Sequence, residues 1–216
     1  MTVAWPVTLS ATTPSGHAVT LGPLRVRQRK EWEGLRRANA DWLREWEATA
    51  PEPVTGRVGY RQMVRYFNRE AVEGRMLPFA ISVDGRLAGQ MHLFGITWGS
   101  MRSGAAGYWV SSSVAGQGIA PISLAMLTDH AFLALGLHRV EVNIRPDNAA
   151  SLRVVAKLGF RDEGLRTRYL HINGAWRDHR SFALTTEDLA GGRLLDRWLD
   201  AVDQPHRRHT DAGPRG

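Results

Sequence analysis

The sequence predicts an α/β (α+β) fold, in which helices flank a mostly antiparallel mixed sheet. Its 43% hydrophobic and 23% charged residues are typical of a globular chain, and 216 residues suffice for one well-packed core. Helical and strand-like segments follow one another in the order β-α-α-β-β-β-α-β-α-β-β. No long linker interrupts this order, so we expect a single domain over 1–203 and a disordered basic tail over 204–216.

Hydrophobic periodicity and turn signals predict the individual elements. Helices are expected where apolar residues recur at about 3.6 positions, and strands where they alternate or run between turn residues. The predicted helices cover 30–47, 60–74, 121–135, 148–158 and 186–202. The predicted strands cover 24–26, 78–83, 86–97, 103–111, 138–145, 160–172 and 176–185, and residues 1–24 are expected to be extended and loop-like. Asp84-Gly85 and Asn173-Gly174 are typical hairpin turns.

Tryptophans recur at near-helical spacing in the first predicted helix, at Trp32, Trp42 and Trp46. We expect them to pack in the core, and the alternative is that they form the wall of a substrate channel.

Charge and composition limit the classes of function. The net charge is +7, carried almost entirely by arginine, so a basic surface would suit a phosphorylated cofactor, RNA or a ribosomal surface. The absence of cysteine excludes disulfides, thiolate nucleophiles and cysteine-ligated zinc, and the histidines show no ligand spacing with carboxylates. No apolar run approaches the ~20 residues that span a bilayer, and the first residues do not form a signal peptide. The expected compartment is therefore the cytoplasm.

The segment 107–120, GYWVSSSVAGQGIA, predicts a strand, a glycine-containing turn and the start of an apolar helix. Such a turn leaves backbone N–H groups unpaired at the positive end of a helix. Glycine at Gly116 and Gly118 removes Cβ atoms that would keep a ligand away from the backbone. The segment therefore predicts a pyrophosphate cradle, with a plain strand-to-helix turn as the alternative. It is neither a Walker A loop nor a full dinucleotide fingerprint, since Gly-Lys-Ser/Thr and a third glycine are missing.

A second polar segment, DNAAS at 147–151, follows a predicted strand and opens a predicted helix. Asn148 and Ser151 are three residues apart, so both side chains lie on the same side of the first helical turn. They are candidates for binding and proton transfer, and the alternative is that they only cap the helix.

Over about residues 20–190 the chain resembles the Gcn5-related N-acetyltransferase (GNAT) superfamily. The strand–GQGIA–helix segment is similar to that family's acetyl-CoA pyrophosphate loop, and DNAAS–helix–LGF to the segment beside the pantetheine and thioester. Residues 169–179, YLHINGAWRDH, resemble the ribosomal-protein N-terminal acetyltransferases RimJ and RimL, and RimJ in particular. Ala115 departs from the usual Arg or Gln, and the frequent central-strand glutamate has no counterpart, since Gln90, His92 and Tyr108 occupy the nearby positions.

The resemblance implies that an amine attacks acetyl-CoA directly in a ternary complex, without a metal. The expected acceptor is the N-terminal α-amino group of a ribosomal protein, with alanine as its first residue. Because an α-amine has a pKa of about 7.7–8.0, against about 10.4 for lysine, a weak base suffices. The alternatives are an acetyltransferase for a small amine (antibiotic, polyamine or metabolite) and a non-catalytic module that binds RNA or the ribosome through its basic surface.

The resemblance also suggests roles for individual residues. The cofactor contacts are expected at Val110, Ser112, Ala115, Gly116, Gln117, Gly118, Ile119, Ala120, Asn143, Asn148 and Ser151. Val110 and Ser112 would offer backbone N–H groups to pantetheine, and a backbone N–H of the strand 107–111 would polarise the thioester carbonyl. Ser151 would donate a proton to the leaving thiolate, with Tyr108 and Asn148 as further catalytic candidates.

The substrate-binding candidates are His92, Tyr169 and Asp178. His92, Tyr108 or Asp178 would hold a water that acts as the weak base. The stretch 177–179 would border a peptide slot, or else form an ion pair and stabilise a turn. Glu45 and Glu47 would attract the ammonium group of the acceptor, unless they only form a solvated helix face.

Overall fold

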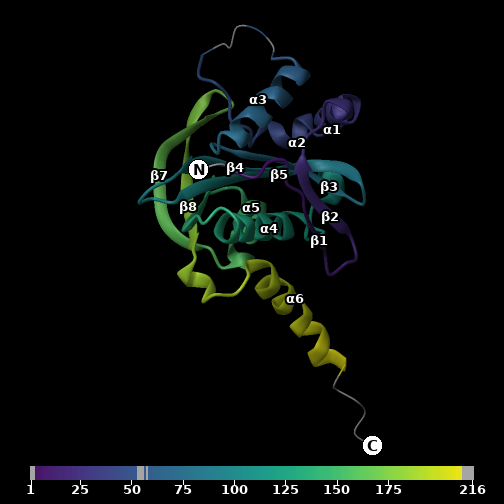
Figure 1. Cartoon of the computed structure of the whole chain (residues 1–216), viewed down its shortest axis with the longest axis vertical. Coiled ribbons are helices and arrows are strands. Elements are labelled where there is room, and N and C mark those ends of the chain that lie inside the picture. The colour runs from purple at the N-terminus through teal and green to yellow at the C-terminus, as the bar shows by residue number, and fades with distance from the viewer. Residues whose placement is uncertain (1–2, 53–55, 57, 211–216) are drawn as a thin grey trace, which may run out of the picture.

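An eight-stranded sheet with strand order β1-β2-β3-β4-β5-β6-β8-β7 organises the chain (Figure 1). The structure is a computed structural model and describes residues 3–52, 56 and 58–210. The strands are β1 (Leu9–Thr12), β2 (Ala18–Pro23), β3 (Leu77–Val83), β4 (Arg86–Thr97), β5 (Ser103–Val110), β6 (Arg139–Ile144), β7 (Arg161–Ile172) and β8 (Ala175–Thr185). The α-helices are α1 (Arg29–Ala38), α2 (Ala40–Arg44), α3 (Tyr60–Val72), α4 (Ile119–Leu133), α5 (Ala149–Leu158) and α6 (Leu194–Thr210). Short 3₁₀ turns are η1 (Val26–Gln28), η2 (Ser112–Val114) and η3 (Glu187–Leu189).

Helices cover both faces of the sheet, which confirms the predicted fold class. Helices α1 to α3 lie over one face, and α4 and α5 over the other, with α6 packed on α4 and α5 (Figure 1). The main core fills the space between the sheet and α4. Helix α4 is mostly apolar on all its faces, which suits its position enclosed by strands and helices. A smaller core, which includes Trp32, Tyr60 and Val64, lies beneath α1 and α3.

Strands β5 and β6 form the parallel pair of the sheet, and they stay paired over only a short distance. The register joins Ser103 to Arg139, Gly104 to Val140 and Ala105 to Glu141, and the pairing stops there. The other neighbouring strands of the described sheet are antiparallel. Beyond Ala105 the facing edges of β5 and β6 therefore carry backbone groups without a partner strand, and this split positions the candidate site.

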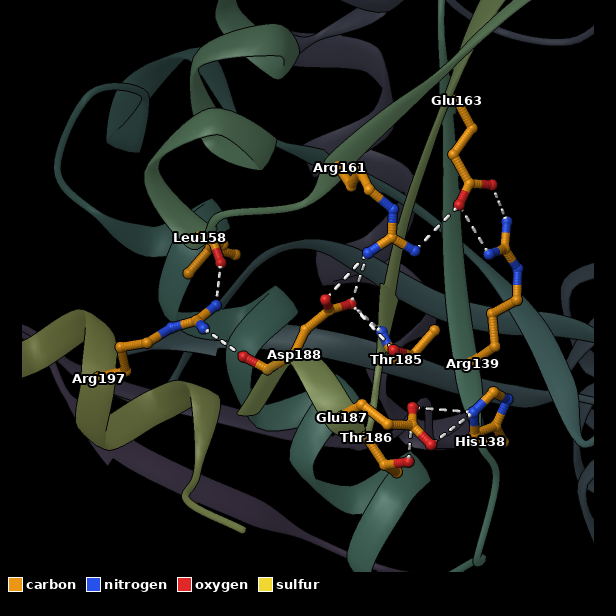
Figure 2. Close-up of polar contacts among 10 residues, drawn as sticks. All are labelled: His138, Arg139, Leu158, Arg161, Glu163, Thr185, Thr186, Glu187, Asp188 and Arg197. Carbon is orange, nitrogen blue, oxygen red and sulfur yellow. Dashed lines mark hydrogen bonds and ion pairs between the residues drawn. The ribbon is translucent and has the colours of Figure 1, made fainter. Parts of the chain in front are cut away.

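The opposite end of β6 is closed by ion pairs (Figure 2). Arg139 contacts Glu141 at 2.9 Å, and both of these side chains are half-buried. Arg139 also bonds Glu163 on β7, as Figure 2 shows. Arg161 bridges Glu163 and Asp188, at 3.2 and 2.9 Å. These contacts fasten β7 and the turn after β8 to the base of β6.

The structure corrects several predicted elements. Residues 1–24 are not merely loop-like, since β1 and β2 pair there and β2 extends the sheet through β3. The predicted strand at 24–26 is wrong, because β2 ends at Pro23 and the chain enters η1. The predicted helix 30–47 is divided between α1 and α2 at Asn39, whose side chain makes tertiary hydrogen bonds. These features depend on contacts distant in sequence, which local periodicity does not reveal.

The C-terminal helix begins later than the pattern predicts. The region 186–202 is divided into η3 and α6, separated by Ala190 and Gly191, which both have positive φ. Asp129 of α4 accepts the backbone N–H groups of Leu194 and Leu195, at 2.7 and 3.1 Å, and so caps α6. Helix α6 continues to Thr210, whereas residues 211–216 of the predicted tail lie outside the described residues. The domain bound at 203 and the disorder of the tail stay predictions.

Candidate active site

A cavity of about 380 Å³ opens where β5 and β6 diverge. It is lined by β5, β6, the start of α5, the β7–β8 hairpin and the segment after α2. The lining residues are Trp46, Ala48, Phe94, Ala106, Gly107, Tyr108, Val142, Asn143, Ile144, Arg145, Asn148, Ser151, Tyr169, Leu170, Ile172 and His179. The predicted residues Tyr108, Asn143, Asn148, Ser151 and Tyr169 are thus brought together.

The glycine-containing turn precedes α4 as predicted. Gly116 and Gly118 both have φ of +80°, a conformation that favours glycine. A Cβ at Gly116 would meet no atom within 4 Å, so this side of the turn is open. In the described part of the chain, the N–H groups of 116–120 donate to no protein acceptor, as expected at the start of a helix. The turn therefore presents a row of free donors at the positive end of α4.

The free edge of β5 supports one of the predicted pantetheine contacts and corrects another. Ser111 donates its N–H to the Ala88 carbonyl on β4 at 2.7 Å, so the Val110 N–H points toward the split, because successive N–H groups alternate along a strand. The Ser112 N–H is not free, because it donates to Asn39 Oδ1 at 2.9 Å. The Val110 carbonyl accepts from Trp42 Nε1 at 3.1 Å, which lays that indole along the same edge.

Tyr108 and Ser151 are neighbours in the wall of the cavity. The Tyr108 hydroxyl is buried and has no hydrogen-bond partner among the described residues. Burial raises the pKa of Tyr108 to about 12, and the neighbouring Ser151 hydroxyl opposes part of this rise. The contact between them lies outside hydrogen-bonding geometry, so each hydroxyl is available to a ligand. Tyr108 is therefore a proton donor or hydrogen-bond partner at neutral pH and not a base.

Asn148 caps α5, because its Oδ1 accepts the Ser151 N–H at 3.0 Å. The capping alternative is thus correct for the Asn148 oxygen, and Asn148 also lines the cavity. The Ser151 side chain takes no part in this cap. On β6, the buried Asn143 Oδ1 has no partner in the described structure.

Arg145 joins the segment after α2 to the end of β6. Its guanidinium lies 4.9 Å from the Trp46 ring centroid and donates to the Glu45 carbonyl at 2.6 Å. It also pairs with Asp147, the residue before Asn148. Ala48 forms a bridge to Ile172 of β7, so the segment crosses one side of the cavity between β6 and β7. Trp46 is therefore a cavity wall, and Trp42 is 45% exposed, whereas Trp32 is a core residue as predicted.

The β7–β8 hairpin contributes Tyr169 and His179 to the cavity. Their rings meet edge to face, with centroids 5.5 Å apart. Asp178, the predicted substrate contact, does not line the cavity, because its carboxylate accepts the Arg168 N–H at 2.7 Å in a bulge of β7. Asp178 also does not form the ion pair with Arg177 that was the alternative, because its carboxylate accepts the backbone N–H of Arg168.

His92 is likewise not among the lining residues. It pairs in register with Gly107, whereas Met91 pairs with Tyr108, so His92 lies on the α3 face of the sheet against Phe67, 5.1 Å between ring centroids. Burial lowers the pKa of His92 to about 4. Of the acidic candidates, Glu47 pairs with Arg36 at 2.6 Å.

Sequence patterns did not identify Phe94, Arg145 and His179 as cavity residues. Phe94 fills the space over Gly107, where a Cβ would approach its ring to 3.0 Å. Alternation along β8 could have indicated His179, since it and the inward Ser181 share one face. The local sequence offers only Asp147 as a partner of Arg145, whereas Glu45 and Trp46 come from the distant segment after α2.

The arrangement fits acetyl-CoA. Free N–H donors at the α4 turn suit a pyrophosphate, and the unpaired edge of β5 with the orphan Asn143 Oδ1 suits the amides of pantetheine. Tyr108 and Ser151 line the same cavity, and their hydroxyls are available to a thioester bound there. Over the described residues, no group of histidine and carboxylate side chains is arranged to hold a metal ion, and no helix is long and apolar enough to cross a membrane.

Comparisons with known proteins agree with this geometry. Residues 19–161 match the Acetyltransferase (GNAT) domain family. The chain is 30% identical to the probable N-acetyltransferase YjcK of Bacillus subtilis over 175 residues, which are 80% of this chain and 97% of that protein. It is 28% identical to the [ribosomal protein uS5]-alanine N-acetyltransferase of Escherichia coli, over 72% of this chain and 81% of that protein.

Among solved structures, the fold is similar to Mycobacterium smegmatis RimJ in complex with CoA-disulfide. The TM-score is 0.86 at 40% identity, and the match covers 94% of this chain and 98% of RimJ. The expected resemblance is therefore confirmed, and the chain belongs to the GNAT acetyltransferase family.

Proposed function

We propose that this protein transfers the acetyl group of acetyl-CoA to the N-terminal α-amino group of a protein, with a ribosomal protein that begins with alanine as the acceptor. The observation that carries the proposal is the cavity at the β5–β6 split, where the free donors of β5 and the side chains of Tyr108, Asn143 and Ser151 meet a partly open β7–β8 wall. The similarity to RimJ and to the uS5-alanine acetyltransferase supports the choice of acceptor.

The charge of the cavity favours an α-amine over a polyamine. Its lining includes Arg145 and, among the described residues, neither aspartate nor glutamate. A site for a small polycation would need carboxylates to balance several positive charges. An α-amine with a pKa of about 7.7–8.0 is instead already the neutral nucleophile in roughly a quarter of molecules near pH 7.4. Three large apolar residues that line the cavity are 37–40% exposed, namely Phe94, Tyr169 and Leu170. The cavity is therefore open to solvent on this side, where a peptide acceptor could enter.

Each part of the site has a distinct task. The N–H groups of 116–120 would hold the pyrophosphate, and Val110 N–H and Asn143 the pantetheine. When bound, acetyl-CoA supplies a thioester whose carbonyl carbon accepts the amine nitrogen and whose sulfur leaves. Ser151 is placed to donate the proton that the sulfur takes up, and Tyr108, neutral at physiological pH, hydrogen-bonds beside it. A backbone N–H of β5 polarises the carbonyl.

The test is CoA release from purified protein with acetyl-CoA and a panel of amines: peptides that begin with Ala, Ser, Met or Asp, an N-blocked lysine peptide, spermidine and an aminoglycoside. We expect turnover of free α-amino peptides, fastest with alanine. Turnover confined to the small amines would assign the protein to small-molecule acetylation.

Binding separates the remaining alternative. Acetyl-CoA should raise the melting temperature even where no acceptor reacts. No turnover and no shift, together with RNA binding that weakens steeply with salt, would replace the proposal with a nucleic-acid-binding module.

A further inference from the structure

His179 occupies a position in the cavity that no part of the proposed function uses. The residue is 4% exposed, on β8, with its ring edge to face with Tyr169. Its Nδ1 lies 3.1 Å from the Arg177 carbonyl oxygen. A carbonyl can only accept, so Nδ1 carries the hydrogen and Nε2 keeps a lone pair. The hydrogen bond thus fixes the tautomer in which the ring nitrogen away from the backbone is a base.

The surroundings favour the uncharged form of this ring. Arg145, which follows β6, contributes a positive charge. Asp147 and Asp178 contribute negative charges that are already engaged, by Arg145 and by the Arg168 N–H. Burial is the largest influence and lowers the pKa of His179 below its usual range. The hydrogen bond to the Arg177 carbonyl opposes this effect, Arg145 adds to it, and the two aspartates also oppose it. Tyr108, Tyr169 and Ser151 are the other titratable or hydroxyl groups around the cavity, and none is a better proton acceptor at neutral pH.

We propose that Nε2 of His179 accepts the proton that the acceptor amine loses as it is acetylated. The inference rests on the proposed function and assigns the base that the missing strand glutamate leaves open. It also separates the two proton transfers spatially, with the base on the β8 wall and the donor Ser151 on α5.

The proposed step balances in atoms and charge. The amine nitrogen forms a bond to the carbonyl carbon while the carbon–sulfur bond breaks, and the sulfur keeps the electron pair. One proton leaves the nitrogen for His179 Nε2, and one proton passes from the Ser151 hydroxyl to the sulfur. Ser151 regains its proton from solvent and His179 returns its own to solvent, so the site is restored.

The experiment compares two substitutions that separate the base from the structural hydrogen bond. His179→Asn retains a donor at the Nδ1 position toward the Arg177 carbonyl but removes Nε2. His179→Gln retains a polar group near the Nε2 position but is not basic. His138→Gln is the matched control, since His138 pairs with Glu187 on the surface at the closed end of β6 (Figure 2). For each we would measure kcat/KM for an alanine peptide across pH, the acetyl-CoA Kd and the melting temperature.

We expect both His179 variants to lose about 100-fold in kcat/KM, within the usual contribution of a positioned general base, with the acetyl-CoA Kd unchanged. In the wild type, kcat/KM should fall with the second power of proton concentration at acid pH, since both the amine and His179 must be deprotonated. In both variants it should fall with the first power only. Full activity of His179→Asn, or an unchanged pH dependence, would overturn the proposal and leave His179 as a structural residue. If the wild type binds no acetyl-CoA and acetylates no amine, the proposed function itself fails.

Discussion

Polar side chains near one end of strand β6 are paired, whereas buried polar atoms near its other end have no partner in the described structure. At the Arg139 end the carboxylates are paired, since Glu141 on β6, Glu163 on β7 and Asp188 in η3 are all engaged by arginines. Figure 2 shows the contacts of Glu163 and Asp188. At the other end, beyond the last pairing with β5, Asn143 Oδ1 and the nearby Tyr108 hydroxyl are buried without partners in the described structure. Both ends belong to the same sheet and are only a few residues apart.

The difference shows where the fold retains binding capacity. A buried polar atom without a partner destabilises the free protein by about 1–3 kcal/mol, so such atoms are rare away from binding sites. Among the described residues, two such atoms, the Tyr108 hydroxyl and Asn143 Oδ1, belong to side chains that line the cavity, whereas others, such as those of Ser123, Thr128 and His130 on α4, lie elsewhere. The closed end stabilises the fold, and the open end is completed only by a ligand. Substitutions at the two ends should therefore affect different measurements.

The largest effect is expected at the chemical end of the open site. Ser151→Ala should lower kcat by about 10–100-fold, because it removes the proton donor to the sulfur, and should leave the acetyl-CoA Kd nearly unchanged. The helix cap should survive, since it uses Asn148 Oδ1 and the Ser151 backbone. Steady-state kinetics with Ser10→Ala as a surface control would check this. An unchanged kcat would remove Ser151 from the chemistry.

The next effect concerns the turn before α4. Gly116→Ala should weaken acetyl-CoA binding about 10-fold, because alanine at φ of +80° is strained by about 1–2 kcal/mol and the turn would leave its conformation. Gly16→Ala is the matched control, since Gly16 has φ of +87° and equally open surroundings in the β1–β2 turn. Titration calorimetry should show weaker binding for Gly116→Ala alone, while both variants unfold more easily. Equal affinity in the two would show that the turn does not hold the cofactor.

Asn143→Leu should change stability and binding in opposite directions. The substitution removes a buried oxygen without a partner, so the free energy of unfolding should rise by about 1 kcal/mol. Acetyl-CoA affinity should fall several-fold, because the same oxygen is expected to accept a pantetheine N–H. Denaturant unfolding and calorimetry on one preparation would measure both. A variant less stable than the wild type would contradict the interpretation of this end as open.

The smallest effect is expected at the closed end. Arg139→Met should lower the free energy of unfolding by about 1 kcal/mol, since Glu141 and Glu163 keep Arg166 and Arg161 as partners. The acetyl-CoA Kd and kcat should stay at their wild-type values. A change in either constant would show that the two ends of β6 are coupled, and the comparison would no longer hold.

Local patterns predicted much of the fold and part of the site. The β3–β4 hairpin, α3 and α5 lie within a few residues of their predicted bounds, because each has a clear period and its own turn or cap residues. The glycines of the α4 turn and the pair Asn148 and Ser151 were also predicted, because their roles depend on helix starts that short segments specify. The strands β1 and β2 were missed, because they are stabilised mainly by pairing along the sheet.

The sequence alone determined the α/β class, the order of its main strands and helices, and the starts of α4 and α5. Tertiary structure decided which atoms are free. It engaged the Ser112 N–H with Asn39, turned His92 to the α3 face, tied Asp178 to Arg168, and placed His179 and Arg145 in the cavity. The physical reason is that periodicity specifies which face of an element is buried, whereas the partner of each polar group depends on neighbours that only the folded sheet brings within hydrogen-bonding distance.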